Sequence, residues 1–177
     1  TALQPGEAVV KVTTVDGGYT AECVVKVSKY ANTITAGNIN ATYGTPYGVI
    51  FDATANKENA VVTYYDGETK LDEKPTNVGT YRVVITVPAT GTYEEVTKEV
   101  TLTIKAKDAE VVWVNANDRT YTGNVFEAPT AYIKDVNNNN LPLVVTMTTE
   151  GVFKDVRKYN FSVTGVANYN LSNTTKV

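Results

Sequence analysis

Thr80-Tyr81-Arg82-Val83-Val84-Ile85-Thr86-Val87 gives the clearest indication of the fold class in this sequence. Its large apolar residues stand on every second position, at Tyr81, Val83, Ile85 and Val87. A period of two is the pattern of a β-strand with one face on a core and the other in water. The same alternation recurs in residues 19–27, 100–104, 141–147 and 159–163. No window carries the period of an amphipathic helix, and we expect at most one helical turn, at residues 56–60.

Turn signals separate these strands at intervals of about ten residues. Asp16-Gly17-Gly18 and Asp66-Gly67 each lie between two alternating runs and predict β-hairpins, because glycine accepts the positive φ angles of tight turns. Residues 88–91, 137–140 and 166–168 are expected loops. The pattern predicts an all-β chain of immunoglobulin-like antiparallel β-sandwich modules, each of about six or seven strands. The alternative is a β-grasp-like module, which needs a helix that the sequence does not offer.

The composition favours sheet and argues against two kinds of partner. The 177 residues include 12 Tyr, 4 Phe and one Trp, and Thr, Val and Asn are abundant. The net charge of -3 comes from 16 basic and 19 acidic residues without a run of either sign, so we expect no nucleic-acid partner and no membrane-binding surface. No apolar segment reaches the roughly 18 residues of a membrane span. Because Thr1 begins in mid-pattern, we expect the chain to be part of a longer protein.

The sequence contains an internal repeat, marked by three tyrosine motifs. Thr42-Tyr43-Gly44 recurs as Thr120-Tyr121-Thr122-Gly123, Asn77-Val78-Gly79-Thr80-Tyr81 as Asp155-Val156-Arg157-Lys158-Tyr159, and Gly91-Thr92-Tyr93 as Ala167-Asn168-Tyr169. The tyrosines are separated by 78, 78 and 76 residues, which predicts a duplicated module. We expect one β-sandwich in residues 31–106 and a second in 107–177. Residues 1–30 carry one hairpin, either the end of a preceding domain or strands donated to the first sandwich.

Two resemblances to known families accompany these motifs. Gly6-Glu7-Ala8-Val9-Val10-Lys11-Val12 and Asp16-Gly17-Gly18-Tyr19-Thr20-Ala21-Glu22-Cys23 resemble the last two strands of a bacterial immunoglobulin-like group 2 domain. The longer repeats resemble the MBG-type repeats of bacterial surface proteins, through Tyr43-Gly44, the Asn-x-Gly-x-Tyr-x-Val of residues 77–83, and Tyr93. The second repeat departs from that pattern, with Arg157-Lys158 where the family has Gly and a small residue. The resemblances imply a multi-domain bacterial protein that is secreted or attached to the cell wall.

One of the tyrosine motifs also has a direct physical interpretation. Asn77 stands four residues before Tyr81, and Asp155 stands four residues before Tyr159. In a tyrosine corner, the hydroxyl of such a Tyr bonds to the backbone a few residues upstream and fixes the turn between two strands. We predict this corner in both repeats. The alternative is that the two tyrosines are only large core residues.

The sequence offers little catalytic chemistry. It has no His, which removes the commonest general base and the Ser/His and Cys/His nucleophile systems. Glu58, Asp72-Glu73 and Glu94-Glu95 are conceivable glycosidase carboxylates, but neighbours on one strand point to opposite faces and do not converge. No glycine-rich phosphate loop occurs. We therefore expect no enzymatic activity, no catalytic or cofactor-binding residue, and no cofactor.

Three further features have both a functional and a structural interpretation. The loop Asp135-Val136-Asn137-Asn138-Asn139-Asn140 is the best calcium candidate, but it lacks the Gly and the distal Glu of an EF-hand. We expect it to be a polar hairpin loop and the chain to hold no metal. Cys23, the only cysteine, is expected to be buried on a strand. Trp113 alternates with Ala109 and Val111 and is expected in a core.

The favoured function is structural: spacer or stalk modules of a bacterial cell-surface or secreted protein. The alternatives are an adhesion or carbohydrate/protein-binding module, and an accessory domain of an extracellular polysaccharide-degrading enzyme. A binder should expose a contiguous aromatic patch, whereas a spacer should bury its Tyr rings. We expect a monomer whose parent protein has a host protein or glycan as partner. The short connection at residues 105–108 predicts little independent swing and an end-to-end arrangement of the sandwiches.

Overall fold

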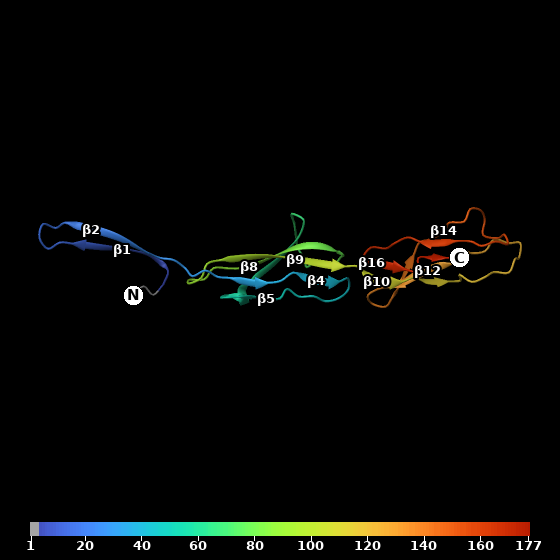
Figure 1. The fold of residues 1–177 in the computed structure, drawn as a ribbon, viewed down its shortest axis with the longest axis horizontal. Helices are drawn as coiled ribbons and strands as arrows, with labels where there is room; N and C mark the ends of the chain where they lie inside the picture. The colour runs from blue at the N-terminus through green and yellow to red at the C-terminus, as the bar shows by residue number, and fades with distance from the viewer. Residues whose placement is uncertain (1–3) are drawn as a thin grey trace. The chain divides into compact units, whose positions relative to one another are not determined.

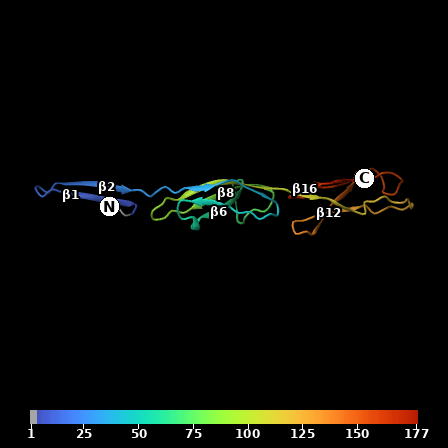
Figure 2. The ribbon, with the colours of Figure 1, turned by 60° about the horizontal axis from the view of Figure 1, so that its bottom comes forward.

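The computed structural model describes residues 4–177, and these form β-strands joined by turns and loops (Figure 1, Figure 2). No α-helix occurs in this range, and η1 at Lys57–Asn59 is a single 3₁₀ turn, where one helical turn was expected. The same residues hold no helix long and apolar enough to cross a membrane. The chain is all-β with several multi-stranded antiparallel sheets, as the alternation predicted. A β-grasp is not favoured, because its sheet would need a helix to wrap.

The fold divides into two compact units. Unit 1 comprises the described part of Thr1–Ile39, together with Gly48–Pro75 and Thr80–Leu102. Unit 2 comprises Asn40–Tyr47, Thr76–Gly79 and Thr103–Val177. Segments that are distant in the sequence therefore fold together within each unit.

The first hairpin forms a two-stranded sheet of its own. Strands β1 (Gly6–Thr13) and β2 (Thr20–Val27) pair antiparallel, and no other described strand joins them. The turn between them has Gly17 at φ 80° and Gly18 at φ 64°, the left-handed backbone that the sequence predicted there. The two strands are therefore not donated to the sheets of the first sandwich.

The two faces of this hairpin differ sharply. On one face the cross-strand pairs are apolar, and they include Val10 opposite Cys23 and Val12 opposite Ala21. On the other face, ion pairs join Lys11 to Glu22 at 3.1 Å and Lys26 to Glu7 at 3.5 Å. The apolar face is open to solvent: Val10 is 50% exposed and Val12 is 61% exposed.

The expectation that Cys23 is buried is wrong for this chain, because Cys23 is exposed. The alternation did place Cys23 on the apolar face of the hairpin. No second layer within residues 4–177 covers that face, and both strands are exposed along almost their whole length. Tyr19, which begins the alternating run, is also 77% exposed. Period two identifies the apolar side of a strand and says nothing of whether another sheet covers it.

The largest sheet contains the stretch from which the fold was predicted. Its order is β4-β9-β8-β6-β7, with β8 in the middle. The alternating residues of β8 are buried, and Val83, Ile85 and Val87 have no exposed surface. The strands are β4 (Ile39–Thr42), β6 (Val61–Asp66), β7 (Thr69–Leu71), β8 (Gly79–Val87) and β9 (Val96–Lys105).

Residues 31–106 thus contain seven strands in two sheets. The second sheet pairs β3 (Ile34–Ala36) with β5 (Phe51–Ala53), whose apolar residues are half-buried. On β9, Val100, Leu102 and Ile104 are buried, as their alternation predicted. The predicted Asp66-Gly67 hairpin joins β6 to β7, with Gly67 at φ 56°.

Residues 107–177 contain eight short strands in three sheets. The sheet orders are β11-β12-β13, β14-β15-β17 and β10-β16, and β10 and β16 run parallel. Val111, Ala131 and Ile133 form the buried core, and the half-buried Trp113 packs against it and donates its indole N–H to the Asn173 carbonyl at 2.9 Å. The strands are β10 (Lys107–Glu110), β11 (Val112–Val114), β12 (Thr130–Lys134), β13 (Asn140–Leu143), β14 (Val145–Met147), β15 (Phe161–Val163), β16 (Tyr169–Ser172) and β17 (Thr175–Lys176).

Two strands predicted as continuous are each divided between two sheets. Residues 141–147 become β13 and β14, which separate at Val144, a residue 70% exposed. The run through Ala109, Val111 and Trp113 becomes β10 and β11, which separate at the buried Val111. The alternation continues across both breaks, because an extended chain can change its hydrogen-bonding partner without changing which side chains point inward.

The connection between β9 and β10 is shorter than predicted. The sequence predicted that residues 105–108 would be the connection, but β9 runs to Lys105 and β10 begins at Lys107. Only Ala106 lies between them. The lack of Gly or Pro in this segment allows both strands to continue into it.

Candidate functional site

A cavity of about 540 Å³ lies in unit 2, within residues 115–177. Its volume falls in the range of roughly 300–1,000 Å³ that is usual for small-molecule sites. The long segments before β12 and before β15 supply most of its walls. The side chains that line it are of two main kinds, aromatic and basic.

The aromatic wall is built around Phe153. The Phe153 ring lies 4.7 Å from the Tyr159 ring and 5.4 Å from the Phe161 ring, both edge to face, and 5.6 Å from the Phe126 ring. The Phe126 N–H donates to the Phe153 carbonyl at 2.8 Å, which ties the two loop segments together. Tyr159 and Phe161 are buried, whereas Phe126 and Phe153 are half-buried. Tyr121 also lines the cavity and is 61% exposed.

Tyr159 forms the predicted tyrosine corner. Its hydroxyl donates to the Val152 carbonyl at 2.7 Å. The same oxygen accepts the Asp155 N–H at 2.8 Å and the Lys154 N–H at 3.2 Å. The prediction is confirmed for the second repeat, and the corner fixes the segment that carries Lys154 and Asp155 at the cavity. In the first repeat, Tyr81 is buried as expected, and its corner stays a prediction.

Arg157 is held against the corner. Its guanidinium lies 5.0 Å from the centre of the Tyr159 ring and donates to the Glu150 carbonyl. Gly151, at φ 108°, leaves the space for it, since a Cβ there would stand 2.1 Å from Arg157 Nη2. Burial acts to raise the pKa of Tyr159, but the guanidinium and the two backbone amides together hold that pKa below its usual value. Interaction with the Tyr159 hydroxyl raises the pKa of Arg157, so the guanidinium stays charged.

The cavity has an excess of positive charge. Five basic side chains line it against two acidic ones, Asp118 and Asp155, although the whole chain has a net charge of -3. None of the ion pairs formed among residues 4–177 involves these cations. The basic residues are Arg119, Lys154, Arg157, Lys158 and Lys176.

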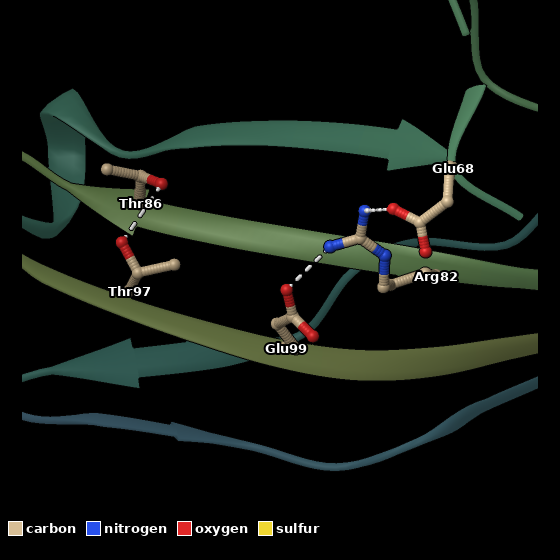
Figure 3. A network of polar contacts seen from close by, with 5 residues as sticks. All are labelled: Glu68, Arg82, Thr86, Thr97 and Glu99. Carbon is tan, nitrogen blue, oxygen red and sulfur yellow. Dashed lines mark hydrogen bonds and ion pairs between the residues drawn. The ribbon is translucent and has the colours of Figure 1, made fainter. Parts of the chain in front are cut away.

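A second charged cluster, on the largest sheet, has its one cation paired with two carboxylates. Figure 3 shows Arg82 of β8 between Glu99 of β9 and Glu68. Its guanidinium lies 2.7 Å from Glu99 and 3.8 Å from Glu68, and its carbon is 4.2 Å from the centre of the Tyr65 ring. Because both carboxylates pair with the same cation, the cluster stabilises the sheet and leaves no carboxylate pair across a cleft.

The carboxylates considered for catalysis do not gather at the cavity. Glu58, Asp72-Glu73 and Glu94-Glu95 are all exposed, and none lines it. No group of three His, Cys, Asp or Glu side chains that could hold a metal ion occurs among residues 4–177.

The calcium candidate is organised as a turn. Asp135 Oδ1 accepts the N–H groups of Asn137 and Asn139, both at 2.8 Å, and Asn138 has φ 65°. The amide hydrogen bonds from Asn139 and Asn137, together with the Lys134 charge, hold the pKa of Asp135 below its usual value. The carboxylate therefore has its hydrogen-bond partners inside the loop, as expected for a polar hairpin turn.

Sequence reasoning missed the cavity. Phe126 and Phe153 stand outside regular strands, so no alternation marks them. The one available signal was Arg157-Lys158, the departure of the second repeat from the pattern of the first. Both residues line the cavity.

Comparisons with protein-family models, curated proteins and solved structures find no match to this chain.

Proposed function

We propose that the chain consists of non-catalytic spacer modules of a bacterial cell-surface or secreted multi-domain protein. The observation that carries this proposal is the placement of the tyrosines. Of the 12 Tyr, only Tyr19, Tyr30 and Tyr121 are exposed, and the other nine are buried or half-buried. The three exposed rings belong to three different segments: the first hairpin, the chain after it, and the loop before β12. This pattern favours a spacer over a protein with a flat aromatic binding face.

A shared backbone pairing supports the duplication within this proposal. Tyr30 forms a parallel bridge with Tyr93, in which the Tyr30 N–H donates to the Thr92 carbonyl at 2.8 Å. In residues 107–177, β10 pairs parallel with β16, and the Lys107 N–H donates to the Asn168 carbonyl at 3.0 Å. Tyr93 and Tyr169 are the third pair of the repeated motifs. Parallel pairing between such short segments is uncommon in antiparallel sandwiches. Here it occurs twice, at positions separated by nearly the same number of residues as the repeated tyrosines, and this recurrence favours an MBG-like repeat.

The first hairpin fits the end of an immunoglobulin-like domain. Its uncharged face has the composition of a core layer, and its ion-paired face has that of a solvated one. Two strands alone are marginal in water, so this face needs a second sheet for stability. Thiol labelling tests the assignment: Cys23 should react rapidly in this chain and slowly in a longer chain that includes the preceding residues. Equal rates in the two chains would contradict it.

Small-angle scattering tests the spacer itself. A single globule of 177 residues has a radius of gyration of roughly 16 Å. A spacer must keep its two ends apart, and the one-residue connection at Ala106 supplies little slack. We expect a radius of gyration clearly above that of the single globule. A compact particle would contradict the proposal.

A further inference from the structure

The basic cavity of unit 2 has features that a spacer does not need. Its five basic side chains outnumber the two acidic ones, Asp118 and Asp155, and aromatic rings stand beside them. Like charges gathered in one cavity repel each other, which costs stability unless an anion joins them. We propose that this cavity binds a sugar unit carrying a carboxylate or sulfate group.

Three of the cavity cations stand at positions that are uncharged in the first repeat. At the offset of 78 residues that separates the motif tyrosines, the cavity cations Lys154, Arg157 and Lys158 correspond to Thr76, Gly79 and Thr80. All three counterparts are uncharged. The tyrosine of the corner is present in both repeats, so it does not account for the cations. The positive charge of these three residues is therefore a property of the second repeat alone.

The aromatic rings and the volume of the cavity restrict the kind of ligand that fits it. Half-buried Phe126 and Phe153 and the more exposed Tyr121 offer apolar surface inside the cavity. The C–H faces of a sugar ring stack on such rings, and a charged substituent on the sugar can then reach the rim. The volume of about 540 Å³ accommodates a ligand of one to a few sugar rings. An extended acidic peptide would instead need a groove or an open strand edge.

The cavity cations differ in whether they already have partners within the chain. Arg157 is committed to the Glu150 carbonyl and the Tyr159 ring, and Arg119 donates to the Asn115 carbonyl at 2.9 Å. These two arginines mainly hold the cavity in shape. Lys154 and Lys158 are exposed and form no ion pair, so their ammonium groups are available to the anion. The Tyr159 corner fixes the backbone at Lys154, which limits the conformational entropy lost on binding.

The test is a titration of the ¹⁵N-labelled chain followed by two-dimensional NMR. The probes are a trimer of galacturonic acid, a sulfated disaccharide, the neutral sugar maltotriose, and triglutamate. We expect saturable shifts in residues 115–129 and 150–160 with at least one of the acidic sugars, and no saturation with maltotriose. The double variant Lys154→Gln/Lys158→Gln should weaken this binding about tenfold or more, because two charge-assisted contacts are lost. The matched control Lys70→Gln/Lys98→Gln removes two exposed lysines elsewhere and should leave the affinity unchanged.

Four results would overturn the inference. They are the absence of saturable shifts with both acidic sugars, equal binding of maltotriose, undiminished binding by the cavity variant, and tighter binding of triglutamate than of either acidic sugar. The last result would assign the cavity to an acidic peptide. The NMR spectrum of each variant also reports whether it is folded. The outcome is independent of the scattering experiment, so a failed binding site and a failed spacer can be told apart.

Discussion

The two repeats keep the same tyrosine and use it differently. In the first repeat, Gly79-Thr80-Tyr81 opens β8, a nine-residue strand in the middle of the largest sheet. In the second, Arg157-Lys158-Tyr159 precedes β15, a strand of only three residues, and the chain before it forms cavity walls. In the first repeat, the tyrosine follows uncharged Gly79-Thr80 and lies in a long strand. In the second, it follows the cations Arg157-Lys158 and lies at the end of a loop. The same tyrosine is thus buried in two different settings, a long strand in one case and the wall of a cavity in the other.

The inward residues of the two strands explain part of this difference. Beyond Tyr81, the buried set continues through Val83, Ile85 and Val87. At the same offset, the second repeat has Phe161, Val163 and Gly165. Gly165 has no side chain to bury, so the strand loses its last core contact and ends at Val163. Relative to β8, β15 is thus shorter at its carboxyl end.

The largest predicted effect concerns one buried aromatic ring in each repeat. Tyr81→Ala should lower the free energy of unfolding by about 3–5 kcal/mol, because it removes a large buried ring and leaves a cavity. Phe161→Ala should cost a similar amount in the second repeat, where the ring also contacts Phe153. Urea unfolding followed by circular dichroism measures both, and Trp113, the only Trp, reports on the second core. A loss below about 1 kcal/mol at either position would show that it is not a core residue.

The next effect compares how much the hydroxyl groups of Tyr81 and Tyr159 contribute to stability. Tyr81→Phe should cost about 1 kcal/mol if the first repeat forms the corner. Tyr159→Phe should lower the urea midpoint further, because its hydroxyl has three backbone partners that would all lose it. Unchanged stability of Tyr81→Phe would mean that only packing remains in the first repeat. Unchanged stability of Tyr159→Phe would contradict the corner seen in the second.

The same comparison shows what the sequence can and cannot predict. The alternation of β8 and β9 predicted the buried faces correctly, because side-chain direction in a strand follows from local geometry alone. The Asp155 and Tyr159 spacing predicted the corner for the same reason. The switch of sheet at Val144 was not predictable, because the choice of hydrogen-bonding partner depends on strands that are distant in the sequence.

The misassignments of Cys23 and of the cavity have one physical origin. Whether a residue is buried, or lines a cavity, depends on which distant segments of the chain pack over it. The local sequence pattern does not contain that information. The apolar face of the hairpin was identified correctly, yet it is open. Phe126 and Phe153 lie in irregular segments, where neither a period of two nor a turn signal applies. In the sequence, only Arg157-Lys158, which stand where the first motif has Gly79-Thr80, distinguished this segment.

A smaller effect tests whether Arg157 shapes the loop before the corner. Gly151→Ala should cost about 1–2 kcal/mol, because alanine is strained at φ 108° and its Cβ would displace the Arg157 guanidinium. Gly165→Ala is the matched control: a Cβ there meets no atom within 4 Å. Thermal unfolding compares the two variants. Equal effects would mean that Arg157 does not depend on the space at Gly151.

The smallest effect concerns two carboxylates, one in each repeat, whose pKa values are both lowered. In the first repeat, the Ala53 N–H and Lys57, with its ammonium 3.3 Å away, lower the pKa of Asp52. In the second, the amides of the turn lower the pKa of Asp135. A carboxyl whose pKa is lower in the folded state than in the unfolded state stabilises the fold above the unfolded value of 3.8. That contribution is lost as the pH falls through the folded pKa, so both carboxylates should stabilise the fold at neutral pH and cease to do so in acid.

NMR titration of the two side-chain carboxyls should give midpoints below 3.8 for both. Lys57→Gln should raise the midpoint of Asp52 and leave that of Asp135 in place, because Lys57 pairs with Asp52, whereas the lysine that acts on Asp135 is Lys134. Addition of millimolar calcium tests whether the Asp135 loop binds a metal ion. If Asp135 serves the turn, calcium leaves its midpoint and the melting temperature unchanged, and chelator does the same. A bound cation would compete with protons, lower the midpoint further and raise the melting temperature, which would make this loop a metal site absent from the first repeat.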